Sequence, residues 1–139
     1  MPSIKKSPLQ GLVIFAKNKE KVSEFYQQAL SLKLVESDKT HDLLVGAGHE
    51  VVVHAISKAY AESIEIATPP VPRDESAMKP TFVVDDLEVV RTAAKATGGF
   101  LKPLKQAWRF RGFVVLDGWD PEGNIVVHDK KKGAFKFFG

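Results

Sequence analysis

The sequence predicts an α+β fold made of two βαβββ modules, because the same series of elements is written twice along the chain. Residues 11–56 and residues 79–129 each read as a strand, an amphipathic helix and three short strands. The two copies end alike, with EVVVH at Glu50–His54 and NIVVH at Asn124–His128. Two curled half-sheets of this kind would face each other across a cleft, which is the place to look for chemistry.

Composition excludes several classes of protein. The 139 residues, 44% of them hydrophobic, suit one domain with its own core. The chain has no apolar run of membrane-spanning length and no signal-peptide stretch before Asn18, so we expect a soluble cytoplasmic protein with no membrane partner. Without cysteine it has no disulfide, thiolate nucleophile or thiolate metal site. The net charge of +3 comes with no nucleic-acid-binding motif, so we expect no nucleic-acid partner.

The first module begins with Gly11–Ala16, an apolar run of strand length, after which Asn18 can cap a helix. The apolar residues of that helix form one stripe, at Val22, Phe25, Tyr26, Ala29 and Leu30. Three strands are expected to follow, at Leu32–Glu36, Asp42–Val45 and Glu50–Ala55. The carboxylates near their turns, at Asp38, Asp42 and Glu50, read as solvated surface groups.

Residues 57–78 are expected to link the modules, because Pro69, Pro70 and Pro72 stop both a helix and a central strand. Tyr60–Ile66 is expected to hold a helical turn or a short strand. The whole chain, 1–139, is then a single domain with a first module (11–56), a linker (57–78), a second module (79–129) and a basic, aromatic tail (130–139).

The second module repeats the series, with a strand at Pro80–Val84 and a helix that Asp85 or Asp86 can cap. Glu88 is placed to form a capping box with Asp85, and Gly98-Gly99 ends the helix. Its apolar stripe consists of Leu87, Val90, Ala93 and Ala94. The expected strands are Phe100–Leu104, Phe110–Leu116 and Ile125–His128.

Asp120-Pro121-Glu122-Gly123 is a strong turn signal before the last strand, with proline second and glycine fourth. In the tail, Lys130, Lys131, Lys132 and Lys136 are read as a solubilising run, with phosphate binding as the alternative. The three tail phenylalanines, Phe135, Phe137 and Phe138, are expected to dock on a neighbouring surface.

Four short motifs in this order resemble the vicinal oxygen chelate superfamily, the group of glyoxalase I, extradiol dioxygenases, fosfomycin-resistance enzymes and bleomycin-resistance proteins. They are Phe25-Tyr26, Val84-Asp85-Asp86, Gly98-Gly99 and Asp120-Pro121-Glu122-Gly123-Asn124, and the resemblance covers roughly residues 10 to 129. It implies curled mixed sheets around a cleft, the glyoxalase/bleomycin resistance/dioxygenase fold, and a homodimer. The linker would permit exchange of modules between the two copies.

The resemblance also implies four positions for a divalent ion, on the first and last strands of each module. Counting from the motifs places them on Gly11, Lys79 and Val127, and the internal repeat places the remaining one on Val53. Metal-dependent relatives carry His, Glu or Gln there, whereas glycine, valine and lysine hold no such ion. We therefore expect no cofactor at the usual site.

A shift of one residue would instead bring His54 and His128 into the cleft together, because strand side chains alternate between faces. The alternative function is then a lyase or dioxygenase with one divalent metal at a displaced site. Otherwise both histidines lie on or beside the helix-covered face, and His41 and His49 are read as surface residues. No Gly-x-Ser-x-Gly elbow or phosphate-binding loop offers other catalysis, so whether the protein is an enzyme stays open.

Alternation predicts a mainly apolar cleft with one ammonium group, that of Lys79. The residues expected to share its face are Val13, Phe15, Thr81, Val83 and Ile125. We predict ligand binding by Lys79, Trp108, Arg111, Trp119 and Phe15. Aromatic rings and cations together suit a neutral or anionic organic molecule, and a basic cleft disfavours a cationic one such as bleomycin. A structural dimer without a ligand is the remaining alternative.

Overall fold

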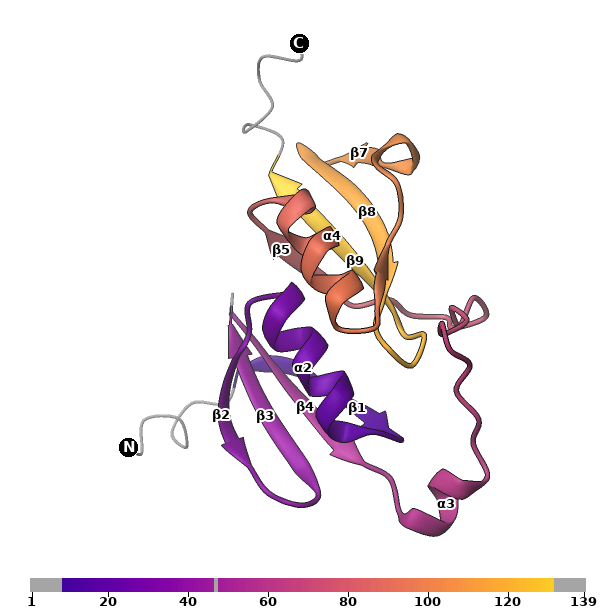
Figure 1. Cartoon of the computed structure of the whole chain (residues 1–139). Coiled ribbons are helices and arrows are strands. Elements are labelled where there is room, and N and C mark those ends of the chain that lie inside the picture. Colours follow the sequence, from indigo (N-terminus) through magenta and orange to yellow (C-terminus); the bar gives the residue numbers. More distant parts are fainter. Residues whose placement is uncertain (1–8, 47, 132–139) are drawn as a thin grey trace.

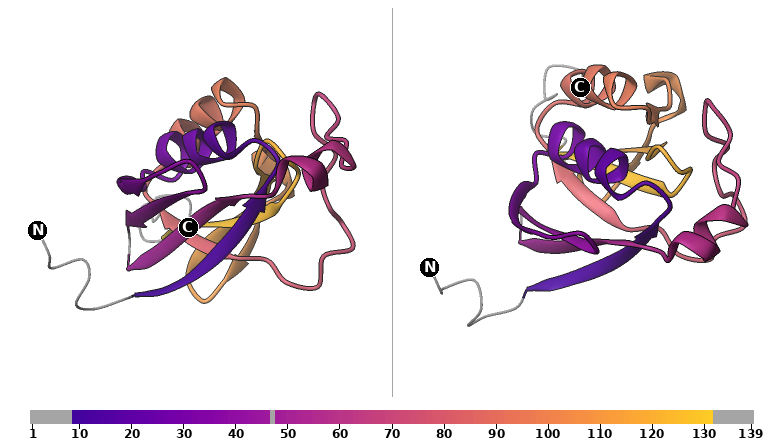
Figure 2. Two further views of the ribbon diagram at one scale, coloured as in Figure 1. Left: turned by 90° about the horizontal axis from the view of Figure 1, so that it is seen from below. Right: turned by 60° about the horizontal axis from the view of Figure 1, so that its bottom comes forward.

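Two curled sheets, neither of them closed into a barrel, make up the described part of the chain, residues 9–46 and 48–131 of a computed structural model (Figure 1). The helices α2 (Lys19–Ala29) and α4 (Leu87–Ala96) pack against each other and lie on the same side of both sheets (Figure 2). The predicted α+β fold with curled mixed sheets is therefore confirmed. Among the described residues, no helix is long and apolar enough to cross a membrane.

The first sheet has four strands in the order β1-β4-β3-β2. Their bounds are β1 Gln10–Ala16, β2 Lys33–Ser37, β3 His41–Gly46 and β4 His49–Ala55. The second sheet has five strands, in the order β5-β9-β8-β6 with β7 also paired to β8. Their bounds are β5 Thr81–Val84, β6 Phe100–Leu101, β7 Trp108–Phe110, β8 Phe113–Trp119 and β9 Ile125–Lys131. Within residues 9–46 and 48–131, β1 pairs in parallel with β4 alone and β5 with β9 alone, so β1 and β5 are each an edge strand of their sheet.

Helix α2 forms as its sequence predicts. Asn18 accepts a hydrogen bond from the Lys21 main-chain N–H at 3.1 Å, which caps the first turn. Every residue of the predicted apolar stripe is buried against the sheets. Each large side chain of that stripe contributes about 1.5–3 kcal/mol by leaving water, which is enough to hold an 11-residue helix that would be marginal alone.

Helix α4 is capped by Asp86, whose carboxylate accepts the main-chain N–H groups of Glu88 and Val89. The predicted capping box between Asp85 and Glu88 is wrong, because Glu88 instead pairs with Arg91 one turn along, at 3.2 Å. Leu87, Val90 and Ala94 are buried as predicted, with Ala93 packed against them.

Two strands of the second module differ from their predicted bounds. The strand predicted at Phe100–Leu104 ends at Leu101, and a 3₁₀ turn at Leu104–Gln106 follows. The strand predicted at Phe110–Leu116 is divided by a two-residue hairpin turn at Arg111 and Gly112. Both have positive φ, 53° and 79°, as a type I′ turn requires. The turn creates β7 and moves the start of β8 to Phe113.

The remaining segments run close to expectation. In the linker, the helical turn predicted within Tyr60–Ile66 is α3 (Lys58–Glu62), capped by Ser57. The last strand continues past His128 to Lys131, so two tail lysines belong to β9. The predictions for the remainder of the tail, residues 132–139, concern residues outside the described ranges.

The motif residues lock the two modules together. The Tyr26 hydroxyl donates to the Asp120 carboxylate at 2.9 Å, and both side chains are fully buried. Burial raises the pKa of Asp120, and burial together with the Asp120 charge raises the pKa of Tyr26 well above its usual range. The Glu122 carboxylate accepts the main-chain N–H groups of Lys17 (2.9 Å) and Asn18 (2.7 Å) at the start of α2. Tyr26, Asp120 and Glu122 are thus engaged in contacts that hold the two modules together.

Candidate functional site

A cavity of about 580 Å³ runs along the free edge of β1, between that strand and the chain segment that leads into β5. One wall is β1 itself, residues Gln10, Gly11, Leu12, Val13, Ile14 and Phe15. The facing wall consists of Arg73, Ser76, Met78, Lys79, Pro80, Thr81, Asn124 and Ile125, and Tyr26 and His49 complete the lining. Apolar walls with a few placed polar groups are typical of small-molecule sites.

Each sheet turns one face away from the helices, and we call these the open faces. In the first sheet this face carries Val13 and Phe15, which are 54% and 64% exposed, while Ile14 and Ala16, which alternate with them along β1, are buried on the helix-covered face. In the second sheet the exposed Thr81 and Val83 alternate with the buried Phe82 and Val84. The predicted alternation along β1 and β5 therefore describes the open faces correctly.

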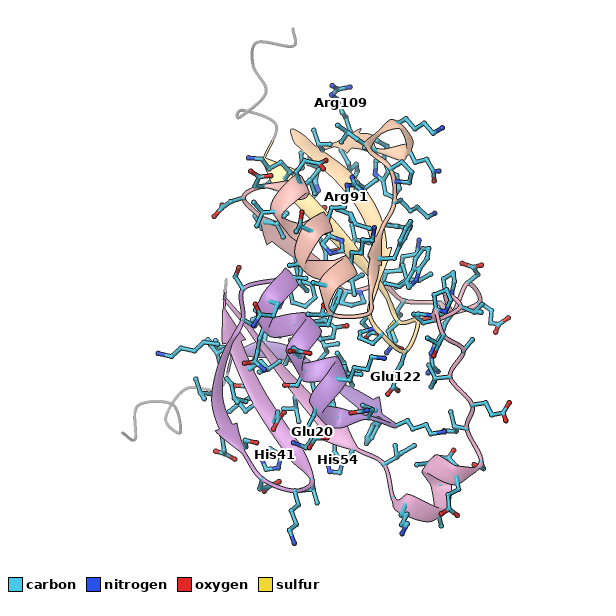
Figure 3. The ribbon with its side chains drawn as sticks, in the orientation of Figure 1. Glu20, His41, His54, Arg91, Arg109 and Glu122 are labelled. Carbon is cyan, nitrogen blue, oxygen red and sulfur yellow. The ribbon has the colours of Figure 1, made fainter. Side chains whose placement is uncertain are left out.

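The predicted ligand-binding residues divide into two groups. Lys79 and Phe15 line the cavity, whereas Trp108, Arg111 and Trp119 lie outside its lining. The Trp119 ring stacks on Phe100, with ring centroids 4.7 Å apart. The Arg111 guanidinium lies 4.9 Å from the centre of the Phe110 ring, in the β7–β8 turn. Figure 3 shows Arg109, on the same hairpin, at the opposite end of the molecule from His41 and His54.

The first of the four positions that the resemblance implies for a metal, Gly11, is closed to any side chain. A Cβ atom on Gly11 would collide with the main-chain carbonyl of Glu50 on β4, the residue that Gly11 pairs with. Backbone atoms cannot move aside as a flexible side chain can, so β1 would have to shift to admit even alanine. The glycine therefore both lacks a donor and excludes one.

The third position is held by an ion pair. The Lys79 Nζ lies 2.8 Å from the Asp117 Oδ2, and the Asp117 side chain is only 8% exposed. An ammonium group thus stands at a position that the resemblance implies for a cation, and its charge is already compensated by Asp117. Asp117 Oδ1 and one oxygen of the neighbouring buried Asp129 have no partner among the described residues. Burial raises the pKa of Asp129, which favours its neutral form.

The position that the sequence analysis assigns to Val53 is wrong by one residue. Val53 pairs with Ile14 and is fully buried on the helix-covered face, so it cannot face the cleft. Thr81 pairs with Val127, and the corresponding residue of the first module, Val13, pairs with Val52. The structural equivalent of Val127 is therefore Val52. The correction leaves the chemistry unchanged, because both residues are valine.

The same one-residue offset between the modules places the two candidate metal-binding histidines on different faces of their sheets. His54 lies on the open face, with its ring 5.6 Å from that of Phe15 and its Nδ1 2.7 Å from the Ala55 carbonyl. His128 is fully buried on the helix-covered face of the other sheet, beside Phe82, where burial lowers its pKa to about 4. The prediction that a shift brings both into the cleft is wrong. Within the described ranges, no three His, Asp or Glu side chains are grouped to hold a metal ion.

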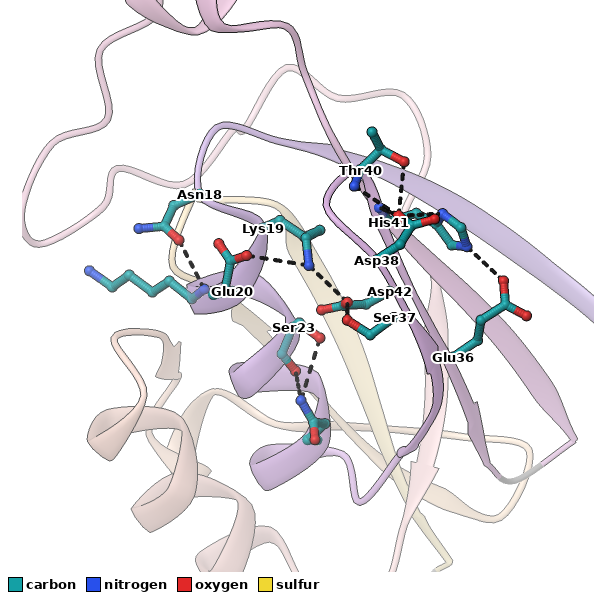
Figure 4. Close-up of polar contacts among 12 residues, drawn as sticks. Asn18, Lys19, Glu20, Ser23, Glu36, Ser37, Asp38, Thr40, His41 and Asp42 are labelled. Atoms are coloured by element: carbon teal, nitrogen blue, oxygen red, sulfur yellow. Dashed lines mark hydrogen bonds and ion pairs between the residues drawn. The ribbon is translucent and has the colours of Figure 1, made fainter.

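Two other predictions about polar residues of the first sheet need correction. His49 is not a surface residue: it is half-buried on the cavity wall, and its ring lies 5.2 Å from that of Phe82. Asp42 is buried rather than solvated, and it forms an ion pair of 2.8 Å with the buried Lys19 (Figure 4). Pairing with Asp42 keeps both charges satisfied inside the first module, so this network is structural.

His41 also makes contacts that the sequence gives no sign of. Its two ring nitrogens lie 2.8 Å from Glu36 and 3.1 Å from Asp38 (Figure 4). The hydrogen bond to Glu36 is the main cause of its raised pKa. Both nitrogens are thereby occupied at the tip of the β2–β3 hairpin, and neither is free to bind a metal ion.

Sequence reasoning missed Arg73, which lies in the linker and yet lines the cavity. Its Nε donates to the Glu122 carbonyl at 3.0 Å, and its main-chain N–H donates to the Gly123 carbonyl at 2.9 Å. Gly123 has φ +87° and takes no side chain there, because its Cβ would collide with the Val71 carbonyl. The linker therefore docks on the turn, and only this docking brings Arg73 to the cavity.

Comparisons with known proteins agree with this architecture. No protein-family profile matches the sequence, and no curated protein matches it. Among solved structures, a glyoxalase/bleomycin resistance protein/dioxygenase family enzyme from Burkholderia phytofirmans PsJN is similar, with a TM-score of 0.62 and 20% identity over 89% of this chain and 98% of that one. A glyoxalase/bleomycin resistance protein from Albidiferax ferrireducens T118 gives 0.60 and 16% over 88% and 97%.

The fosfomycin resistance protein FosX from Mesorhizobium loti is also similar, with a TM-score of 0.60 and 10% identity over 95% of this chain and 98% of that chain. Identities this low establish a shared architecture and leave the activity open. The agreement extends over nearly the whole described chain and includes both modules. The chain thus has the fold of these glyoxalase/bleomycin resistance/dioxygenase proteins.

Proposed function

We propose that this protein binds a small organic molecule, neutral or anionic, in the cavity beside β1, without a metal ion at the positions that metal-dependent relatives use. The observation that carries the proposal is that the positions implied for a metal are blocked or paired, whereas the cavity beside them is open. Gly11 is closed by the Glu50 carbonyl and Lys79 is paired with Asp117, whereas a cavity of about 580 Å³ remains beside them.

The walls suggest how such a molecule would be held. Its apolar part would lie on Val13 and Phe15, whose exposed surfaces gain about 25 cal/mol per Å² when covered. Its polar part would meet Thr81, Ser76 and Asn124 across the cavity. Trp108 lies in the same row of the second sheet as Val83 on the open face, because it pairs with Val115, Val115 pairs with Asp129, and Asp129 pairs with Val83. A ligand long enough to extend from the cavity along this open face would therefore reach towards Trp108.

The residues do not fit a catalytic metal, so we derive no reaction step through one. The four corrected positions, Gly11, Val52, Lys79 and Val127, offer no imidazole and no carboxylate. If the protein is an enzyme, a glyoxalase-like lyase or dioxygenase activity would have to use groups other than these. Binding is the function that the described geometry supports best.

Filling the cavity tests the proposal. Naphthalene-2-carboxamide and naphthalene-2-carboxylate serve as a neutral and an anionic probe in isothermal titration calorimetry. We expect the wild type to bind at least one of them, and Val13→Trp to abolish binding because Val13 lines the cavity. The matched control is Val89→Trp, at a 64% exposed position on α4 outside the lining. Equal binding by both variants would contradict the proposal, as would loss of binding after chelation with EDTA.

We further propose that two copies associate through the open faces. Val13 and Phe15 on β1 and Val83 on β5 are exposed, and each of these strands is an edge strand of its sheet among the described residues; uncovered apolar surface of this kind marks an interaction site. A structural dimer without a ligand would use the same surface. Light scattering after size exclusion should give twice the monomer mass for wild type and a monomer for Val83→Lys, and a wild-type monomer at high concentration would refute the dimer.

A further inference from the structure

We propose that Arg73, and not Lys79, recognises the charged end of the ligand, and that this end is a carboxylate. The inference rests on the proposed function, since it concerns the same cavity. Arg73 and Lys79 are the two cationic side chains in the cavity lining, and they differ in how their charge is used.

The charge of Lys79 is already compensated. Its Nζ donates to Asp117 at 2.8 Å, and that carboxylate is nearly buried. An anionic ligand at Lys79 would have to share the ammonium with Asp117 or displace it, leaving a buried carboxylate uncompensated. Such an arrangement is strongly unfavourable. Lys79 is thus a poor anion contact, despite its position.

The charge of Arg73 has no such partner. Among the described residues, no carboxylate lies within ion-pair distance of its guanidinium, and the Glu122 carboxylate beside it is used by Lys17 and Asn18. Among the residues that the structure describes, its one side-chain hydrogen bond runs from Nε to the Glu122 carbonyl at 3.0 Å, and neither Nη group has a partner there. That bond also holds the guanidinium in place, so less side-chain freedom is lost when a ligand binds.

The groups around Arg73 favour a ligand that has a carboxylate and an apolar body. Two Nη groups in one plane match the two oxygens of a carboxylate. A phosphate dianion would call for a second uncompensated cation, and the described lining offers none. Across the cavity stand Val13 and Phe15, which would cover the apolar body. The ligand class is therefore a hydrophobic monocarboxylate.

The experiment compares naphthalene-2-carboxylate with its uncharged isostere naphthalene-2-carboxamide by calorimetry, in wild type, Arg73→Gln, Arg73→Lys and the control Arg109→Gln. Arg109 is an exposed arginine on β7, at the top of the molecule in Figure 3, and it is not among the residues that line the cavity. Wild type and Arg109→Gln should prefer the carboxylate. Arg73→Gln should lose about tenfold or more in affinity for the carboxylate and keep its affinity for the amide within about twofold. Arg73→Lys, which keeps the charge but not the planar fork, should fall between.

The outcomes separate the two proposals. If wild type binds neither probe, the proposed function fails and this inference fails with it. If wild type binds the probes but Arg73→Gln weakens both equally, or neither, the function stands and the role of Arg73 is refuted. Tighter binding of naphthalene-2-phosphonate than of the carboxylate would refute the carboxylate class. A thermal unfolding midpoint equal to that of wild type confirms that each variant is folded.

Discussion

Acid should destabilise this protein through one buried histidine, His128. Its imidazole is fully buried in the second sheet, with Nδ1 3.3 Å from the Leu116 carbonyl and no described partner for Nε2. Burial lowers its pKa from 6.5 to about 4. Between these two values the unfolded chain takes up a proton that the folded protein excludes, so the free energy of unfolding falls as pH falls.

The size of the effect follows from that difference. The change in the His128 pKa from 6.5 to about 4 corresponds to about 3 kcal/mol when complete, most of which is lost by pH 4.5 and almost none at pH 7.5. This is a large fraction of the ~5–15 kcal/mol stability of a typical domain. His128→Leu removes the titrating group and the unpartnered nitrogen, so the variant should lose less stability than wild type on acidification.

The assay is urea unfolding followed by circular dichroism at pH 4.5, 5.5, 6.5 and 7.5. Other groups also titrate in this range, so the informative quantity is the stability of His128→Leu minus that of wild type at each pH. We expect this difference to grow by about 2–3 kcal/mol from pH 7.5 to 4.5. His54→Leu, which changes the half-buried histidine of the open face, is the matched control and should retain the steep acid dependence. A pH-independent difference for His128→Leu would refute the reasoning.

Three further substitutions test contacts around the site, each by urea unfolding at pH 7.5. Gly11→Ala should cost about 1–3 kcal/mol, because its methyl group meets a main-chain carbonyl of β4; an unchanged midpoint would show that β1 can move. Tyr26→Phe should cost about 1–3 kcal/mol, since the buried Asp120 carboxylate loses a donor, and an Asp120→Asn background should reduce that cost. Lys79→Met should cost about 1–2 kcal/mol, because the Asp117 carboxylate, 8% exposed, loses its partner while the Lys79 side chain, 41% exposed, is partly screened by water; adding Asp117→Leu should restore most of this loss, and an unchanged midpoint for Lys79→Met would show that the ion pair contributes little.

The sequence by itself determined the local structure of this protein. Apolar residues at helical spacing define α2, and Asn18 marks its first turn through a hydrogen bond within four residues of chain. The turn at Asp120–Gly123 is equally local, because the φ preferences of proline and glycine act within it. Residue types alone also show that the four positions implied for a metal carry no imidazole or carboxylate, and the correction from Val53 to Val52 does not change this.

The tertiary structure decided which groups meet. Strand alternation gives two faces but does not say which one the helix covers, and a slip of one residue reverses the answer for every side chain. For that reason His54 and His128, which look equivalent in the sequence, lie on opposite kinds of face. The pairing of Lys79 with Asp117, 38 residues away, and the docking of Arg73 on the Glu122 turn, 49 residues away, depend on the whole chain being folded. Contacts over such separations leave no periodic signal in the sequence, so the charge of this cavity could be read only from the folded molecule.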